Sequence, residues 1–288
     1  MNNYVIVTDT GSDLTKELID ELGVRVMNLE LNIDGETPEV SNSVETVEFY
    51  KMLRAGKTAT TSAIGIDRFI KEFEPILEEG KDVLYIGFSS GLSGTYNAGF
   101  VAAKELADKH PYRKIYTVDT LAASMGEGLL VWYAAKMKEE GRSIEEVRDF
   151  LEENKLSLCH WFTVNDLFFL KRGGRISAAT AVMGTMLNIK PVLHVDNDGK
   201  LISVSKARGR RAAIDALFQK VKETAKDNVA DQMIFISHGD CETDAKYLAE
   251  KICRELGVKD VKIGYIGPVI GAHSGPETLA VFFLGSQR

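Results

Sequence analysis

The first half of the chain alternates short apolar runs with amphipathic segments, and this order restricts the fold more than any other feature. Apolar runs occupy residues 4–8, 24–33, 83–88 and 114–118, and segments with helical spacing lie between them. A strand followed by a helix and then by another strand favours a parallel sheet with helices on both faces. We therefore predict an α/β/α parallel-sheet domain over residues 1–157.

The second half has a different pattern. Residues 191–195 and 201–204 are apolar runs joined by Asp-Asn-Asp-Gly at 196–199, which is typical of a β-hairpin. Further strands alternate with helices up to a closing strand at residues 279–284. A hairpin combined with βαβ units predicts a second α/β domain, with a mixed sheet covered by helices, over residues 158–288.

The turn after the run 83–88 carries groups suited to an anion. Its sequence is Ser-Ser-Gly-Leu-Ser-Gly-Thr at 89–95, and a helical segment starts at Tyr96. The uncovered N–H groups and the dipole at a helix start favour an anion, and the hydroxyls add donors. A tight turn of small residues that allows close helix packing explains the same residues. The anion site and the packing turn therefore both remain possible interpretations of this segment. G-x-G-x-x-G and G-K-[ST] are absent from this turn, which disfavours a nucleotide site.

A serine hydrolase is the alternative function for this segment. Ser93 lies on a strand–turn–helix, as the nucleophile of an elbow does, but G-x-S-x-G needs a glycine one place later than Gly94. His238 and His273 are the candidate bases, with no spacing that makes either specific. The other histidines, including His160 and His194, have no suggestive neighbours.

Three further segments are rich in hydroxyl or basic side chains. Residues 58–62 (Thr-Ala-Thr-Thr-Ser) form a loop or short strand whose hydroxyls cap the next helix or bind a polar ligand. Residues 171–176 (Lys-Arg-Gly-Gly-Arg-Ile) form a basic turn, suited to a carboxylate or phosphate or simply solvated. Residues 206–211 form a second basic run, which is a solvated or partner-binding face or, alternatively, a DNA-binding segment.

Composition excludes several classes of protein. A net charge of −7 argues against a general nucleic-acid binder. The three cysteines are scattered, and His238 with Asp240 supplies only two ligands, so we expect no metal site. The apolar runs are too short for a signal peptide or a membrane span, so we expect a cytoplasmic protein without stable membrane insertion. The apolar stretch 178–187 is either core or the wall of an adaptable hydrocarbon pocket.

Taken in order, several motifs resemble those of the bacterial DegV family of fatty-acid-binding proteins. The matching pieces run through nearly the whole chain: V-T-D-T-G-S-D-L at 7–14, T-T-S at 60–62, S-S-G-L-S-G-T-Y at 89–96, V-D-T at 118–120, L-K-R-G-G-R-I-S at 170–177, N-I-K-P-V-L at 188–193 and H-S-G-P at 273–276. No single piece is decisive, but their combined order and spacing are specific.

The resemblance implies a long-chain fatty acid held between two α/β domains. Its carboxylate would be held by hydroxyls and backbone amides at Thr61, Ser62, Ser93 and Gly94, with His273 behind them. A fatty acid needs an apolar slot with a few polar groups at one end, which agrees with these motifs. Burial of the tail contributes about 0.8 kcal/mol per CH₂, so the tail supplies most of the affinity.

The resemblance also implies a role as a carrier. Some family members present the bound acid to a separate ATP-dependent kinase that makes an acyl phosphate, and Arg172 and Arg175 match the family's basic turn. In that scheme the chain is not an enzyme and needs no cofactor. One departure is local, because Ser62 is followed by Ala-Ile-Gly at 63–65 where the family often has a polar residue, proline and serine. This puts the local loop geometry and one helix-capping contact in question.

Overall fold

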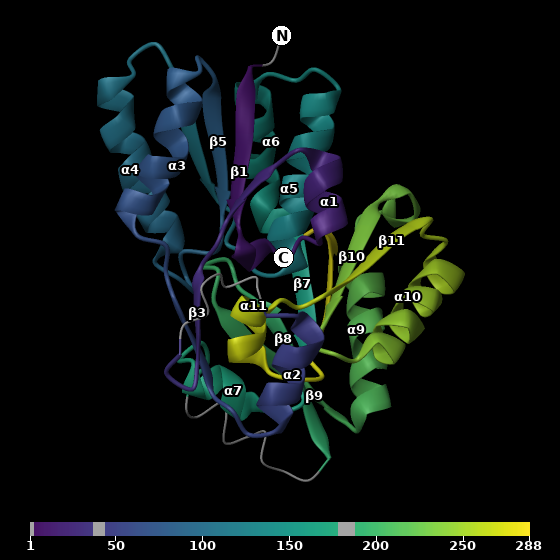
Figure 1. Ribbon diagram of the computed structural model, residues 1–288. Coiled ribbons are helices and arrows are strands. Elements are labelled where there is room, and N and C mark those ends of the chain that lie inside the picture. Colours follow the sequence, from purple (N-terminus) through teal and green to yellow (C-terminus); the bar gives the residue numbers. More distant parts are fainter. Residues whose placement is uncertain (1–2, 37–43, 178–187) are drawn as a thin grey trace.

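The computed structural model describes residues 3–36, 44–177 and 188–288, and it shows two lobes, each built around its own sheet (Figure 1). The apolar stretch 178–187 lies outside the described residues. Within those residues, no helix is both long and apolar enough to cross a membrane.

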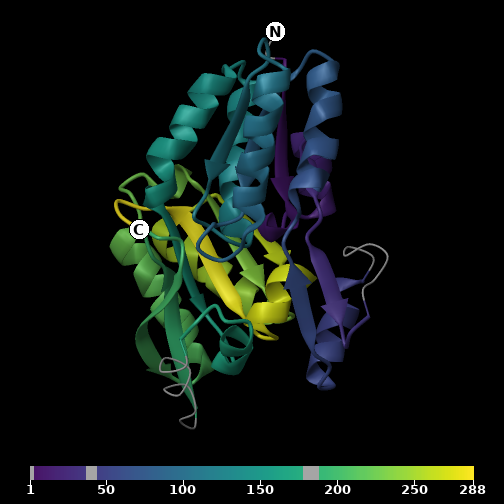
Figure 2. The ribbon, with the colours of Figure 1, turned by 90° about the vertical axis from the view of Figure 1, so that its left-hand side faces the viewer.

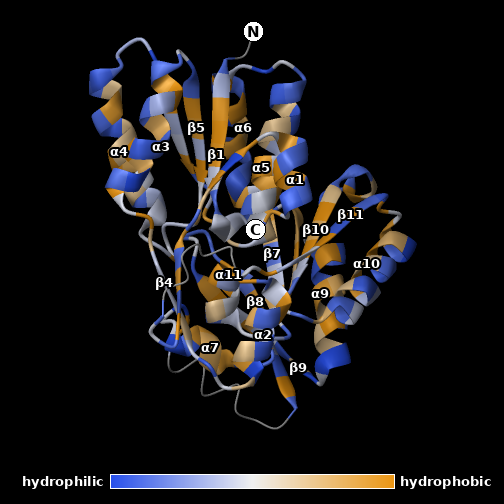
Figure 3. Cartoon of the chain, in the orientation of Figure 1, coloured by the Kyte–Doolittle hydropathy of each residue, from blue (hydrophilic) through white to orange (hydrophobic). Residues whose placement is uncertain are grey.

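The first sheet is parallel throughout, as predicted. Its order is β2 (Arg25–Met27), β1 (Tyr4–Asp9), β5 (Asp82–Gly87) and β6 (Ile115–Asp119). One face is covered by α3 (Ile66–Glu78) and α4 (Thr95–Lys109), and the other by α1 (Lys16–Leu22), α5 (Met125–Glu139) and α6 (Ile144–Asn154). Because side chains alternate along a strand, Val83 and Tyr85 pack towards α3 and α4, while Leu84 and Ile86 pack towards α5. These strands are mostly hydrophobic, whereas the helices expose hydrophilic faces (Figure 3).

The second sheet is mixed, which also agrees with the prediction. Its order is β11 (Asp260–Tyr265), β10 (Met233–His238), β12 (Leu279–Leu284), β7 (Leu158–Thr163), β8 (Ile189–Val195) and β9 (Leu201–Arg208). The pair β10–β11 is parallel and the other pairs are antiparallel. The helices α9 (Arg210–Thr224) and α10 (Glu242–Leu256) cover one face.

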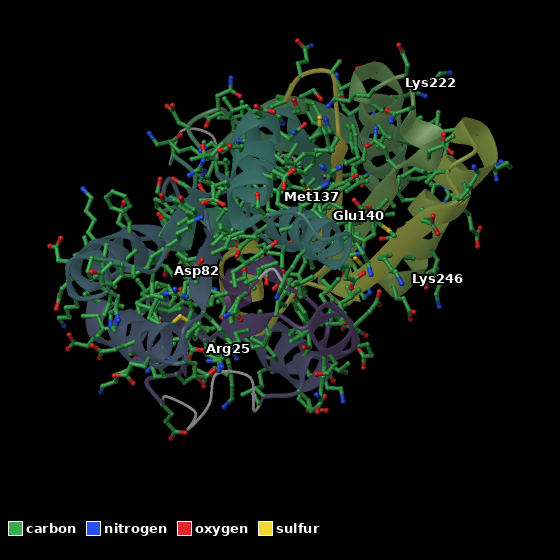
Figure 4. All side chains as sticks on the ribbon, turned by 90° about the horizontal axis from the view of Figure 1, so that it is seen from above. Arg25, Asp82, Met137, Glu140, Lys222 and Lys246 are labelled. Atoms are coloured by element: carbon green, nitrogen blue, oxygen red, sulfur yellow. The ribbon has the colours of Figure 1, made fainter. Side chains whose placement is uncertain are left out.

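Helix α5 covers the other face of the second sheet and so joins the two lobes. Met125 and Leu129 of α5 belong to one core cluster with Leu84 of the first sheet and Phe282 of the second. Seen from above, Met137 of α5 lies between Asp82 of the first sheet and Lys222 of α9 (Figure 4). The first sheet, α5 and the inner face of the second sheet therefore share one core cluster, while the α3–α4 side and the α9–α10 side each have a cluster of their own.

A two-stranded arm leaves the first lobe and lies alongside the second. It consists of β3 (Glu30–Ile33) and β4 (Ala59–Ser62), and it packs with α2 (Thr46–Arg54) against α11 (Pro268–Ser274) (Figures 1 and 2). The hydroxyl of Tyr50 in α2 donates to the carbonyl of Ile266 at 2.8 Å. The predicted single strand 24–33 is therefore wrong: β2 pairs with β1, whereas β3 turns away to pair with β4. The boundary at residue 157 stays a prediction.

The basic turn predicted at 171–176 and the H-S-G-P motif at 273–276 each overlap the end of a short helix. Residues 167–172 form α7 (Leu167–Arg172), and residues 268–274 form α11, which starts with Pro268. Glycine disfavours helices, so a segment with glycines at 267, 271 and 275 reads locally as a turn. Contacts of α11 with α7 and β4 provide the packing that overrides this preference. Three short 3₁₀ turns complete the described structure: η1 (Thr10–Ser12), η2 (Lys155–Ser157) and η4 (Val229–Asp231).

Candidate functional site

A mostly apolar pocket lies where the arm, α11 and the inner face of the second sheet meet. Its walls come from both halves of the chain, and its apolar lining includes Leu29, Phe88, Phe162, Leu170, Val269 and Phe282. Polar side chains gather at the α11 end, where Thr61 comes from β4, Ser93 from the turn after β5, and His273 from α11. The pocket thus combines a mostly apolar lining with a cluster of polar side chains at the α11 end.

Thr61 and His273 form a hydrogen-bonded pair at this polar end. The distance between Thr61 Oγ1 and His273 Nε2 is 2.8 Å. Burial and then the positive charges of Arg175 and Arg172 lower the pKa of His273 to about 4, so its ring is neutral at pH 7. Its buried Nδ1 has no hydrogen-bond partner among the described residues.

The unpaired Nδ1 favours one tautomer of His273. A proton on Nδ1 would be a buried donor without an acceptor, whereas a proton on Nε2 is accepted by the Thr61 hydroxyl. In the Nε2–H tautomer the hydroxyl hydrogen of Thr61 is free to donate elsewhere. His273 therefore prepares Thr61 to donate to an acceptor in the pocket.

Ser93 lies at the start of α4. Its Oγ is 2.9 Å from Thr95 Oγ1 and accepts a hydrogen bond from the Thr95 N–H at 3.2 Å. Thr95 Oγ1 also accepts from the N–H of Ile64 at 3.4 Å. The segment Ala-Ile-Gly at 63–65 is thus tied to α4 and buries Ile64. The N-cap residue of α3 is Gly65, which provides no side-chain cap.

Arg175 holds the loop that carries Ser93. Its Nε and Nη2 both donate to the carbonyl of Leu92, at 3.1 and 3.0 Å, and its Nη1 donates to the carbonyl of Gly173. A side chain at Gly173 would overlap His273 Nδ1, so the glycine allows the basic turn to lie directly against that ring. The turn therefore positions both Ser93 and His273.

The β8–β9 hairpin closes onto the same loop. Ser89 Oγ donates to the carbonyl of Gly199 at 2.9 Å, and a side chain at Gly91 would overlap the backbone at Asp198 and Gly199. Part of the Gly- and Ser-rich segment, which the sequence left open as an anion site or a packing turn, thus forms contacts between the lobes. Ser93 is the member of this segment that lines the pocket along with Leu92.

The structure brings together four of the predicted site residues, namely Thr61, Ser93, His273 and Arg175, as lining of one pocket. The other three do not line it. Ser62 is exposed on the opposite face of β4, Gly94 is exposed at the start of α4, and Arg172 is exposed with its guanidinium 4.8 Å from the ring of Phe169.

Sequence reasoning missed four polar residues that line the pocket: Ser124, His160, Ser274 and Thr278. Ser274 follows His273 in the H-S-G-P motif, so the motif was an available signal. Ser124 and His160 gave none, because one follows an alanine pair and the other lies within an apolar strand.

Buried carboxyl groups support the pocket from behind. Asp13 accepts hydrogen bonds from the hydroxyl of Ser124 at 2.6 Å and from the N–H of Gly267, next to α11, at 2.9 Å. Burial raises the pKa of Asp13 to about 7, although these hydrogen bonds oppose the shift. Burial likewise raises the pKa of Asp9 to about 6. Asp13 therefore links α11 to the start of α5.

The contacts do not favour the alternative functions. The hydrogen bond of His273 goes to Thr61 and that of Ser93 Oγ goes to Thr95, so a Ser93–histidine pair is not among the contacts of the described residues. In the second basic run, Arg210 pairs with Asp244 at 2.8 Å and Arg211 lies over the ring of Tyr247. Within the described ranges, no group of three or more His, Cys, Asp or Glu side chains could hold a metal ion.

Comparison with known proteins shows the family of this chain. The family model "Uncharacterised protein, DegV family" matches residues 3–286. The chain belongs to the DegV family. A DegV domain-containing protein of Clostridium perfringens is 45% identical over 290 residues, which cover 100% of this chain and 99% of the relative. A Streptococcus pyogenes relative is 36% identical over 286 residues, covering 99% of each chain.

Solved structures of DegV family proteins share this fold. A Thermus thermophilus protein described for its fatty acid binding has a TM-score of 0.87 and 32% identity, covering 98% of this chain and 99% of its own. A Thermotoga maritima protein reported to reveal a fatty acid binding function has a TM-score of 0.85 and 31% identity, covering 99% of this chain and 100% of its own. Bacillus subtilis DegV, a fatty acid binding protein, has a TM-score of 0.85 and 27% identity, with coverages of 99% and 100%.

Proposed function

We propose that this protein binds a long-chain fatty acid in the pocket and holds its carboxylate at the α11 end. The observation that carries the proposal is the asymmetry of the pocket, whose apolar walls end at Thr61, Ser93 and His273. The fatty-acid-binding relatives in the same family support the same ligand class.

The polar end suits a carboxylate because it offers donors without a buried ion pair. The hydroxyls of Thr61 and Ser93 donate to the carboxylate oxygens, and Ser93 lies just before the start of α4, near the positive end of that helix. Arg175 lies beside this site and is already bound to Leu92, so it contributes positive potential without a direct contact. Burying a carboxylate without such partners would be costly.

The apolar part of the pocket suits the acyl tail. The face of the second sheet that points into it carries Phe162, Ala280 and Phe282, and Leu201 and Val195 continue the surface. Each buried CH₂ stabilises the complex by about 0.8 kcal/mol. The tail therefore provides most of the affinity, and the polar end fixes which way the acid enters.

Mass spectrometry of denatured, freshly purified protein tests this proposal directly. We expect co-purifying long-chain fatty acid, and we expect the delipidated protein to bind palmitic acid again. Absence of lipid together with no rebinding would refute the proposal. The same preparation treated with a fluorophosphonate probe should stay unlabelled at Ser93, since the protein acts as a carrier.

We also propose that the bound acid is presented to a separate kinase that forms an acyl phosphate. Lys171 and Arg172 are exposed on α7, which packs against α11, and the charge of Arg172 acts on His273. An exposed cation beside the carboxylate site is suited to an anionic phosphate or to an acidic partner surface.

Reconstitution with ATP and a fatty acid kinase subunit tests the carrier role, with acyl phosphate trapped by hydroxylamine. We expect Arg172→Ala to lower turnover while leaving fatty-acid affinity unchanged. Lys222→Ala is the matched control, because Lys222 is an exposed cation on α9, on another part of the molecule (Figure 4). Equal turnover in both variants would exclude Arg172 from this role.

A further inference from the structure

The interior of the pocket holds a polar group that a plain hydrocarbon tail leaves unused. His160 lies in β7, is only 1% exposed and lines the pocket. Neither of its ring nitrogens has a hydrogen-bond partner among the described residues. In the same lining, Thr61, Ser93, Ser124 and Arg175 are hydrogen-bonded to protein groups, and the other unpaired polar atoms, Ser274 Oγ and His273 Nδ1, belong to α11.

His160 is well separated from the polar end. Alternate residues of two paired strands face the pocket, so His160 and Phe162 of β7 line it opposite Phe282 and Ala280 of β12. The pair Thr163–Leu279 ends these strands nearest to α7 and α11. His160 lies three residues farther along the strand, which at 3.3 Å per residue is about 10 Å. A ligand with its carboxylate near Thr61 would pass His160 with the middle of its chain.

The surroundings of His160 are apolar and fixed. Its ring is 5.9 Å from that of Phe282, and a side chain at Gly126 of α5 would overlap both rings. Burial lowers the pKa of His160 well below its ordinary value, and the nearby Arg288 and His194 lower it further. The neutral ring offers one N–H donor and one nitrogen acceptor. Leaving both unpaired costs about tenfold or more in an equilibrium constant, so a polar ligand group at this point would be favoured.

We propose that His160 forms a mid-chain subsite for a hydroxyl group, so that the pocket accepts a hydroxy fatty acid as well as a plain one. A hydroxyl both donates and accepts, so it pairs with the imidazole in either tautomer, whereas a keto oxygen pairs with only one. The inference rests on the proposed function, because it uses the carboxylate at the α11 end to set the register of the chain.

Competition binding to the delipidated protein tests the subsite. The ligands are stearic acid and hydroxystearic acids that differ only in the position of the hydroxyl. We expect one or two adjacent positions to bind as tightly as stearic acid or tighter, and the other positions to bind about tenfold more weakly because their hydroxyl is buried unpaired. A uniform penalty at every position would overturn the inference.

Variants separate the hydrogen bond from the shape of the pocket. His160→Leu should weaken the preferred isomer about tenfold relative to stearic acid, and His160→Gln, which keeps a donor and an acceptor, should restore most of the preference. His194→Leu is the matched control, since His194 is a buried histidine of the adjacent strand whose ring stacks on Trp161 and does not line the pocket. A preferred position that is unchanged in His160→Leu would also overturn the inference. If stearic acid itself fails to bind the wild-type protein, the proposed function fails, which is a distinct result.

Discussion

The two ends of the pocket are built in different ways. The α11 end is assembled from element termini and turns, which bring Thr61, Ser93 and His273 together from distant parts of the chain. The other end is the face of a sheet, where His160 and Phe282 lie on paired strands. Termini expose polar backbone and side-chain groups, whereas a sheet face presents alternate side chains in a fixed array. The α11 end is therefore suited to binding a charged group. The sheet face is suited to contacting the acyl chain at fixed positions.

Filling the sheet end should have the largest effect on binding. Ala280→Phe places a ring in the pocket from β12. If it displaces about three methylenes, the affinity for palmitic acid should fall by about 2.4 kcal/mol, or roughly 60-fold. The melting temperature of lipid-free Ala280→Phe is the control, because it separates loss of pocket space from loss of the fold. Isothermal titration with palmitic acid checks the prediction, and an unchanged affinity in a folded variant would contradict the placement of the tail against β12.

Removing a hydroxyl at the α11 end should have the next largest effect. Thr61→Val and Ser93→Ala each remove a hydrogen bond to a charged group, which corresponds to about tenfold or more in affinity for palmitic acid. Binding of cetyl alcohol should change much less, since it has no carboxylate. Thr60→Val is the control, because Thr60 is exposed and points to the other face of β4. Loss of affinity for acid and alcohol alike would mean that these hydroxyls support the fold rather than the head group.

A smaller loss of affinity should follow when a substitution at Gly173 displaces the ring of His273. Gly173→Ala adds a methyl group that overlaps His273 Nδ1, so the ring must shift away from its hydrogen bond with Thr61. We expect a loss of a few-fold in affinity for palmitic acid and a modest drop in melting temperature. Gly65→Ala is the matched control, since it also has a negative φ and a methyl group there meets open space. If the two variants bind equally, the close contact of the basic turn with His273 is not needed for binding.

The smallest effect concerns Asp13, which links α11 to the start of α5. The folded-state pKa of Asp13, about 7, lies above its ordinary value of 3.8, so its contribution to stability is full below about pH 4 and is lost as the pH rises towards 7. Asp13→Asn removes this titration. Its stability relative to wild type should therefore improve between about pH 4 and pH 7, as measured by urea unfolding. Asp108→Asn, at an exposed carboxylate, should run parallel to wild type. A parallel profile for Asp13→Asn would contradict the raised pKa.

The sequence was most informative where residues interact with their neighbours along the chain. The Asp-Asn-Asp-Gly turn predicted the β8–β9 hairpin, because Gly199 has a φ of +72° that suits glycine in a tight turn. The apolar runs predicted β1, β5 and β12, whose residues are buried on both faces. The family motifs also predicted Thr61, Ser93, His273 and Arg175 as site residues, and all four line the pocket.

It was least informative where distant contacts decide the outcome. The helix α11 contains glycines and forms because it packs against the arm and α7. His160 sits within an apolar strand, and its isolation from hydrogen-bond partners becomes visible only when the second sheet is assembled. From the sequence, Arg175 could be a solvated basic side chain. In the structure it donates to the carbonyl of Leu92 across the lobes.

The sequence by itself determined the two α/β lobes, the family and the polar groups available for a carboxylate, because hydrophobic periodicity and turn chemistry are local properties. The tertiary structure decided which of those groups share a pocket, since Thr61 faces inward and the adjacent Ser62 faces outward. It also decided that His160 lines the same pocket as these polar groups. A pocket between two lobes is a property of side chains that are far apart in sequence, so only their packing can define its shape.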